Sequence, residues 1–166
     1  MGVILADRNK IYVTYWREHK NGKFDPKLIE TNLSCLICKP TKAFWGSPVN
    51  ATFGWKEWCE GDDYEHDFSN PIYWRLKEGS KILTVNMEDV TDPKSMLYLY
   101  AHLDCGGMLN YFDFRKMRED GIDAVELMDA NIGHLCINRL ERMFNAWDCE
   151  SIVLLNPSKL ILKSSL

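Results

Sequence analysis

Two acidic residues lie one position apart, just before the most apolar run of the chain. They are Asp148 and Glu150, and the run is 151–155 (SIVLL). Because residues i and i+2 of a strand point the same way, both carboxylates are expected on one side of a strand edge. A carboxylate pair beside an opening can perform general acid–base chemistry. The alternative is that both carboxylates are simply solvated, as most surface charges are.

Other residues of chemical interest have simpler explanations. Cys35 and Cys38 form a CxxC pair, but no second ligand pair follows at zinc-site spacing, so we expect these thiols in a core. A structural metal module around them stays an alternative. The four histidines share no spacing that would indicate a metal site or a base. The acidic segment 60–67 (EGDDYEHD) lacks the calcium-loop pattern and is expected to be a solvated loop.

Tryptophan is unusually frequent, with six residues in the chain. Four of them, Trp45, Trp55, Trp58 and Trp74, fall within thirty positions. Core packing explains some of this aromatic content. A tryptophan also has a flat face that suits a ring-shaped ligand, so part of the cluster is a candidate pocket lining.

Composition predicts one folded domain over residues 1–166. Hydrophobic residues make up 46% of the chain and the formal net charge is −4, which argues against disorder and against generic nucleic-acid or membrane binding. No stretch approaches the ~20 apolar residues of a membrane span. The first ten residues do not resemble a secretory signal, so we expect a cytoplasmic protein with reduced cysteines.

Short elements of mixed type are expected along the chain. The predicted strands are 3–6, 11–16, 43–46, 72–76, 81–85, 124–127 and 151–155. The predicted helices are 25–32, 54–60, 95–103, 113–119 and 134–144. We expect two hairpins, one joining 3–6 to 11–16 and one joining 72–76 to 81–85. Strands and helices do not alternate, which favours an α+β fold with mainly antiparallel strands.

Two runs in the C-terminal half resemble small ADP-ribosyltransferase-like domains. They are 120–126 (DGIDAVE) and 150–161 (ESIVLLNPSKLI). The resemblance continues in order with a first motif on the strand at 11–17, a second ending at Ser47 and an acidic third motif at 148–150. The segments 45–48 and 54–59 are also similar to small phage-type proteins of this kind. The resemblance implies a split core of two mainly antiparallel sheets, flanked by short helices, around an NAD cleft.

The resemblance also implies roles for particular residues. Glu150 and Asp148 are the expected catalytic pair, one stabilising the positive charge that develops on the ribose and one orienting or deprotonating the acceptor. Ser47 is expected to hydrogen-bond the nicotinamide side of NAD. Either Tyr15 or Arg17 is expected to hold the ribose or a phosphate. The flat faces of Trp45 and Trp58 are candidates for stacking on nicotinamide.

The first and second motifs depart from the family pattern, since no Arg or His stands in mid-strand and Ser47 precedes a proline. Arg139 and Arg142 precede the acidic motif, where the family's target-recognition loop lies, but they also suit the polar face of a helix.

The expected activity is mono-ADP-ribosyl transfer from NAD, used as a substrate, to a macromolecular target such as a host protein, as in phage anti-defence (anti-CRISPR) enzymes. A nucleic-acid target stays open, and no membrane partner is expected. The alternatives are a catalytically degenerate binding or inhibitor protein and an NAD glycohydrolase.

Overall fold

The computed structural model describes residues 2–15, 24–29, 33, 39–40, 43–102, 111–129, 140, 143–144 and 147–164. The strands are β1 (Val3–Leu5), β2 (Tyr12–Tyr15), β3 (Phe44–Pro48), β4 (Pro71–Leu76), β5 (Lys81–Val85), β6 (Ala101–His102), β7 (Tyr111–Phe112), β8 (Ala124–Leu127), β9 (Ser151–Leu154) and β10 (Leu160–Lys163). The helices are α1 (Trp55–Gly61), α2 (Met87–Thr91) and α3 (Phe114–Glu119), with 3-10 turns η1 (Pro26–Leu28), η2 (Met96–Leu99) and η3 (Pro157–Lys159). The predicted α+β class is confirmed.

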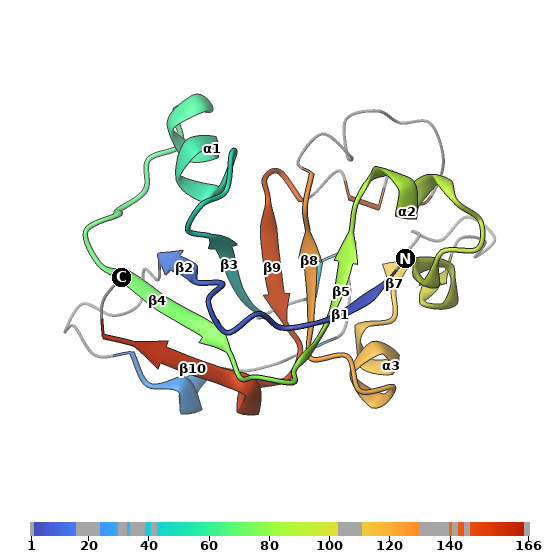
Figure 1. Cartoon of the computed structure of the whole chain (residues 1–166). Helices are drawn as coiled ribbons and strands as arrows, with labels where there is room; N and C mark the ends of the chain where they lie inside the picture. The colour runs from blue at the N-terminus through green and yellow to red at the C-terminus, as the bar shows by residue number, and fades with distance from the viewer. Residues whose placement is uncertain are drawn as a thin grey trace.

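Eight strands form one mixed sheet in the order β1-β5-β8-β9-β3-β2-β4-β10, and β6 pairs with β7 separately. All neighbours are antiparallel except β5 and β8. Strand β3 joins the two halves, because Phe44–Gly46 pair with β9 whereas Ser47 and Pro48 pair with β2. Figure 1 shows β5, β8 and β9 side by side, with β4 and β10 running obliquely to them. The sheet therefore changes direction at β3.

Both predicted hairpins are wrong. Strand β1 pairs with β5 rather than with β2, and β2 lies between β3 and β4. Strands β4 and β5 belong to opposite halves of the sheet, although only the turn at 77–80 separates them. Gly79 has a φ of +78°, and this turn passes the chain from one half to the other. Both turns lie where the sequence predicts them, but a turn does not decide which strand becomes the partner.

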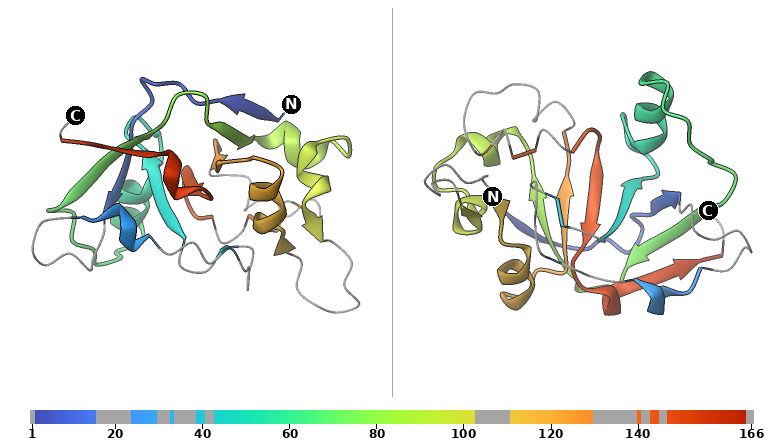
Figure 2. Two further views of the ribbon diagram at one scale, coloured as in Figure 1. Left: turned by 90° about the horizontal axis from the view of Figure 1, so that it is seen from below. Right: turned by 180° about the vertical axis from the view of Figure 1, so that it is seen from behind.

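The observed helices agree with the predicted helix ranges to different degrees. Helix α3 begins as expected, with the Asp113 side chain accepting a hydrogen bond from Lys116 N, and Gly121 follows it with a φ of +84°. The predicted helix 95–103 is wrong. It shortens to η2, after which Ala101 and His102 pair with β7. Most of the predicted helix 134–144 lies outside the described residues. Figure 2 shows α2 and α3 near β5 and α1 at the opposite end of the sheet.

Two hydrophobic clusters cover the two faces of the sheet. Along β8 and β9 the residues alternate between them, as period-two strands require. Val125 and Val153 belong to the larger cluster, whereas Ala124 and Ile152 belong to the smaller one. Strand β9 is an interior strand with all four residues buried, as expected for the most apolar run of the chain.

A polar junction joins the two sequence runs on which the family resemblance rests. The Asp123 carbonyl accepts hydrogen bonds from Leu155 N and Asn156 N. Its carboxylate accepts one from the Asn156 side chain at 2.9 Å and one from Lys81 N at 3.0 Å. These residues therefore fix the ends of β8, β9 and β5 together. Among the described residues, no helix is long and apolar enough to cross a membrane.

Candidate functional site

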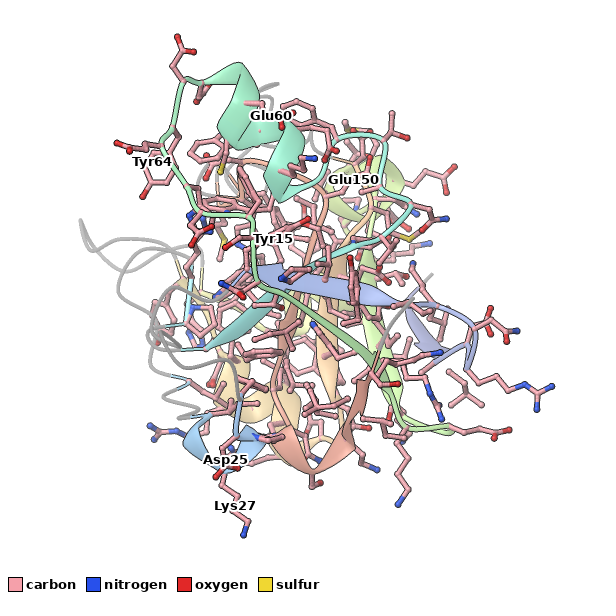
Figure 3. The ribbon with its side chains drawn as sticks, turned by 90° about the vertical axis from the view of Figure 1, so that its left-hand side faces the viewer. Tyr15, Asp25, Lys27, Glu60, Tyr64 and Glu150 are labelled. Atoms are coloured by element: carbon pink, nitrogen blue, oxygen red, sulfur yellow. The ribbon has the colours of Figure 1, made fainter. Side chains whose placement is uncertain are left out.

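A cavity of about 310 Å³ lies where β2, β3 and the segment before β9 meet. Four residues predicted for the site line this main pocket: Tyr15, Trp45, Ser47 and Asp148. They come from three separate stretches of the chain, and the change of direction at β3 brings them together. Figure 3 shows Tyr15 lying beneath α1 and far from Asp25 and Lys27 of the η1 segment, so the pocket lies at the α1 end of the molecule.

The pocket walls are mainly aromatic. Trp45 packs edge-on against Trp147, with ring centroids 4.7 Å apart. On another wall, Trp55 and His66 meet at 5.8 Å with perpendicular rings. Burial raises the pKa of Tyr15, so its hydroxyl stays protonated and can donate a hydrogen bond. Such walls suit a flat ring with a few polar substituents.

Ser47 ties the pocket to the start of α1. Trp45 and Ser47 are two positions apart on β3, so both side chains point into the same pocket. The buried Ser47 hydroxyl oxygen accepts a hydrogen bond from Trp55 N at 3.0 Å. It thereby satisfies one of the amides that a helix start leaves without an intrahelical partner. Ser47 therefore holds the Trp55 wall in place, and its hydroxyl also forms a hydrogen bond with Cys149.

Asp148 forms an ion pair at the pocket that the sequence did not predict. Its carboxylate lies 3.4 Å from the Lys39 ammonium, and the side chains are 34% and 39% exposed. The same ammonium sits 5.6 Å from the Trp45 ring centroid, within cation–π range. Lys39 directly follows the CxxC pair but belongs to no motif that indicates a ligand site, so only the tertiary structure reveals its role.

Cys149 also lines the pocket, but it is not a nucleophile in this state. Burial raises the pKa of the thiol to about 12, although a hydrogen bond with Ser47 and the charge of Lys39 act in the opposite direction. A thiol with that pKa is almost entirely protonated near neutral pH. The chemistry of the pocket must therefore come from other groups.

Glu150 does not share the main pocket with Asp148. Strand β9 begins only at Ser151, so the alternation that placed both carboxylates on one side does not apply, and that expectation is wrong. The Glu150 carboxylate instead accepts hydrogen bonds from Thr52 N and Phe53 N, at 3.3 Å each. It lines a second cavity, of about 550 Å³, together with Glu126.

Glu126 is a buried carboxylate that the sequence analysis overlooked. It is 1% exposed, lies 2.7 Å from the Lys10 ammonium and accepts a hydrogen bond from the Tyr12 hydroxyl at 3.3 Å. Burial raises its pKa, whereas Lys10 and Tyr12 lower it. The signal was present in the sequence, because an acidic residue inside the apolar run 124–127 is unusual.

The remaining predicted site residues lie elsewhere. Trp58 stacks on Trp55 at 4.8 Å and is not among the residues lining the main pocket. Arg17 falls outside the described residues, as do the CxxC pair and both arginines of 139–142. Segment 60–67 is exposed apart from the half-buried His66. Within the described part of the chain, no group of three or more His, Cys, Asp or Glu side chains could hold a metal ion.

No family model, curated protein or solved structure matches this chain. What the protein does is therefore inferred from its own residues and their geometry. The main pocket combines aromatic walls, one carboxylate, one ammonium and the buried hydroxyl of Ser47. It can hold a planar ring and place a negative charge beside it.

Proposed function

We propose that this protein is an NAD-dependent mono-ADP-ribosyltransferase and that the nicotinamide end of NAD binds in the main pocket. The observation that carries the proposal is that Tyr15, Trp45, Ser47 and Asp148 line one pocket. The sequence resemblance assigned a role in NAD chemistry to each of them. The change of sheet direction at β3 supports a split core with a cleft, as that family resemblance implies.

The proposed reaction uses the pocket as follows. The bond between nicotinamide and ribose C1′ breaks, and its electron pair leaves with nicotinamide. The acceptor forms the new bond to C1′, and its proton is released to bulk water. Positive charge develops on the ribose as the old bond stretches, and the Asp148 carboxylate stabilises it. We assign this role to Asp148 rather than Glu150, because only Asp148 lines the aromatic pocket.

The size and walls of the cavity fit one end of the dinucleotide. A volume of about 310 Å³ is at the small end of ligand pockets, suited to nicotinamide and part of its ribose rather than to whole NAD. Trp45 and Tyr15 supply faces and edges for the ring. When NAD enters, the Ser47 hydroxyl can turn from the Cys149 sulfur, a weak acceptor, and donate to a carbonyl such as that of the nicotinamide amide.

The test is transfer from NAD labelled in its adenylate part to proteins of a bacterial lysate. Asp148→Asn should lower labelling by about 100-fold or more, while the NAD-induced rise in melting temperature persists. Glu150→Gln, the matched carboxylate outside the pocket, should retain labelling within about tenfold and cost about 1–2 kcal/mol of stability. Loss of labelling only in Glu150→Gln would reverse the assignment of the acid.

A second candidate function is binding without catalysis. It is favoured by the ion pair of Asp148 with Lys39, because Asp148 is the sole carboxylate among the described pocket residues and its charge is already partly neutralised. A melting-temperature shift with NAD, but neither labelling nor nicotinamide release, would support this function. Nicotinamide release without labelling would indicate an NAD glycohydrolase. No shift, label or release would overturn the NAD site altogether.

The biological setting belongs to the proposal as well. We infer a cytoplasmic enzyme, phage-borne and directed at a host protein, from the resemblance to phage-type members of the family. The labelled band identifies the target directly, and nuclease treatment of the lysate distinguishes a protein acceptor from a nucleic acid.

A further inference from the structure

The main pocket has a cationic residue that the family resemblance does not assign. Lys39 is the one lysine or arginine among the described residues that line it. Its ammonium contacts two residues of the proposed site, with the Asp148 carboxylate at 3.4 Å and the Trp45 ring centroid at 5.6 Å. Its side chain is 39% exposed, so it lies at the pocket mouth, where solvent and ligands can reach it.

The ion pair of Lys39 and Asp148 is weakly held. Both side chains are partly exposed and the nitrogen–oxygen distance is long for a charge-assisted hydrogen bond. Exposed pairs of this kind contribute little to stability, because water screens them and two flexible side chains must be fixed. A ligand with a stronger negative charge can therefore take the ammonium from Asp148 at small cost.

We propose that Lys39 binds the diphosphate of the dinucleotide and exchanges Asp148 for a phosphate oxygen when NAD enters. The inference rests on the proposed function and deepens it. A diphosphate carries two negative charges and several acceptor oxygens, whereas Asp148 carries one charge. The exchange also releases the Asp148 carboxylate, which then faces the ribose with its full negative charge.

The diphosphate favours a cation at this position. Without Lys39, Asp148 would be the one charged group among the described lysine, arginine and carboxylate side chains of the pocket, and it would repel the two negative charges of the diphosphate. With Lys39 the charges at the mouth balance, and the long stem of lysine lets the ammonium move from the carboxylate to the phosphate. The aromatic walls bind the nicotinamide ring. Lys39 favours ligands that carry a phosphate group on the ribose attached to that ring.

The test measures NAD affinity by calorimetry in three variants. Lys39→Gln should weaken NAD binding by about 10-fold or more, as expected for loss of a charge-assisted contact. Lys39→Arg should restore affinity to within about threefold, because the charge is kept. Lys56→Gln is the matched control. Lys56 is 49% exposed on α1 and lies outside the pocket lining, so its loss should change affinity by less than about twofold.

Two further ligands test whether the effect of Lys39 depends on the phosphate groups of NAD. ADP-ribose keeps the diphosphate and should lose affinity by the same factor in Lys39→Gln, whereas nicotinamide riboside is a cation without phosphate and should not bind more weakly. Equal weakening of NAD and nicotinamide riboside would mean that Lys39 acts through Trp45 on the ring site, and it would overturn the inference. Unchanged NAD affinity in Lys39→Gln would also overturn it while leaving the proposed function intact. If the unaltered protein binds no NAD, the proposed function fails first.

Discussion

Gly46 is a position where one added methyl group should be costly. It lies on β3 between Trp45 and Ser47, where the sheet changes direction. A Cβ built there would lie 2.8 Å from a ring carbon of Trp74 and 3.1 Å from the Thr14 hydroxyl oxygen. Ordinary van der Waals contact begins near 3.4 Å, so the ring would have to retreat by about 0.6 Å.

Trp74 has little room for that retreat. Its side chain is 0% exposed, and its ring packs against Tyr12 at 4.9 Å and Phe44 at 5.3 Å between centroids. Its ring N–H donates a hydrogen bond to the Thr14 hydroxyl at 2.9 Å, which the new methyl group would also crowd. Overpacking of a filled core costs about 1–3 kcal/mol, and a disturbed hydrogen bond adds about 1 kcal/mol. We therefore expect Gly46→Ala to lower the free energy of unfolding by about 2–4 kcal/mol.

Urea denaturation followed by far-ultraviolet circular dichroism measures this cost. Gly61→Ala is the control, because a Cβ at Gly61 meets no heavy atom within 4 Å. As Gly61 is the last residue of α1, alanine there should leave stability unchanged or raise it by up to about 1 kcal/mol. In a Trp74→Phe background, Gly46→Ala should cost less, since the clashing ring carbon is gone. A Gly46→Ala protein within about 0.5 kcal/mol of the unaltered chain, at equal denaturant slope, would refute the packing argument.

Two further predictions concern titratable groups. Burial raises the Glu126 pKa above its ordinary 4.5, so the native state holds that proton more tightly than the unfolded chain, and stability falls as pH rises from about 4.5 through the native pKa. The stability of the unaltered protein relative to Glu126→Gln should fall across that window in urea titrations, and a rise would contradict the assigned cause. Cys149, with its pKa raised to about 12, should resist iodoacetamide in the native state at pH 8 and react after unfolding, as peptide mass spectrometry would show. Rapid native alkylation of Cys149 would indicate an open, activated thiol.

Local patterns were predictable wherever neighbouring residues decide the structure. Strands β8 and β9 begin where the sequence predicts. Helix α3 has the expected cap at Asp113, because a short side chain at a helix start can bond only to amides two or three residues on. Strand pairing was not predictable in this way. Turn signals at 7–9 and 77–80 predict hairpins, whereas long-range packing pairs β1 with β5 and β2 with β4.

The candidate site shows the same division. Trp45 and Ser47 could be placed together because a strand repeats every two residues. The separation of Asp148 from Glu150 was not visible in the sequence, since it depends on the two distant backbone amides that Glu150 contacts and on the Lys39 ammonium beside Asp148. Lys39 and His66 carried no motif, and both reach the main pocket only through the folded chain.

The sequence by itself determined the α+β class, the apolar interior strand at 151–154 and the residue types available for NAD chemistry. Those properties follow from composition and periodicity, which act over a few neighbouring residues. Only the tertiary structure decided which acid faces the aromatic pocket, which lysine accompanies it and how the sheet turns at β3 to form that pocket. Those properties depend on contacts between residues more than one hundred positions apart, such as Lys39 with Asp148, and no local pattern encodes them.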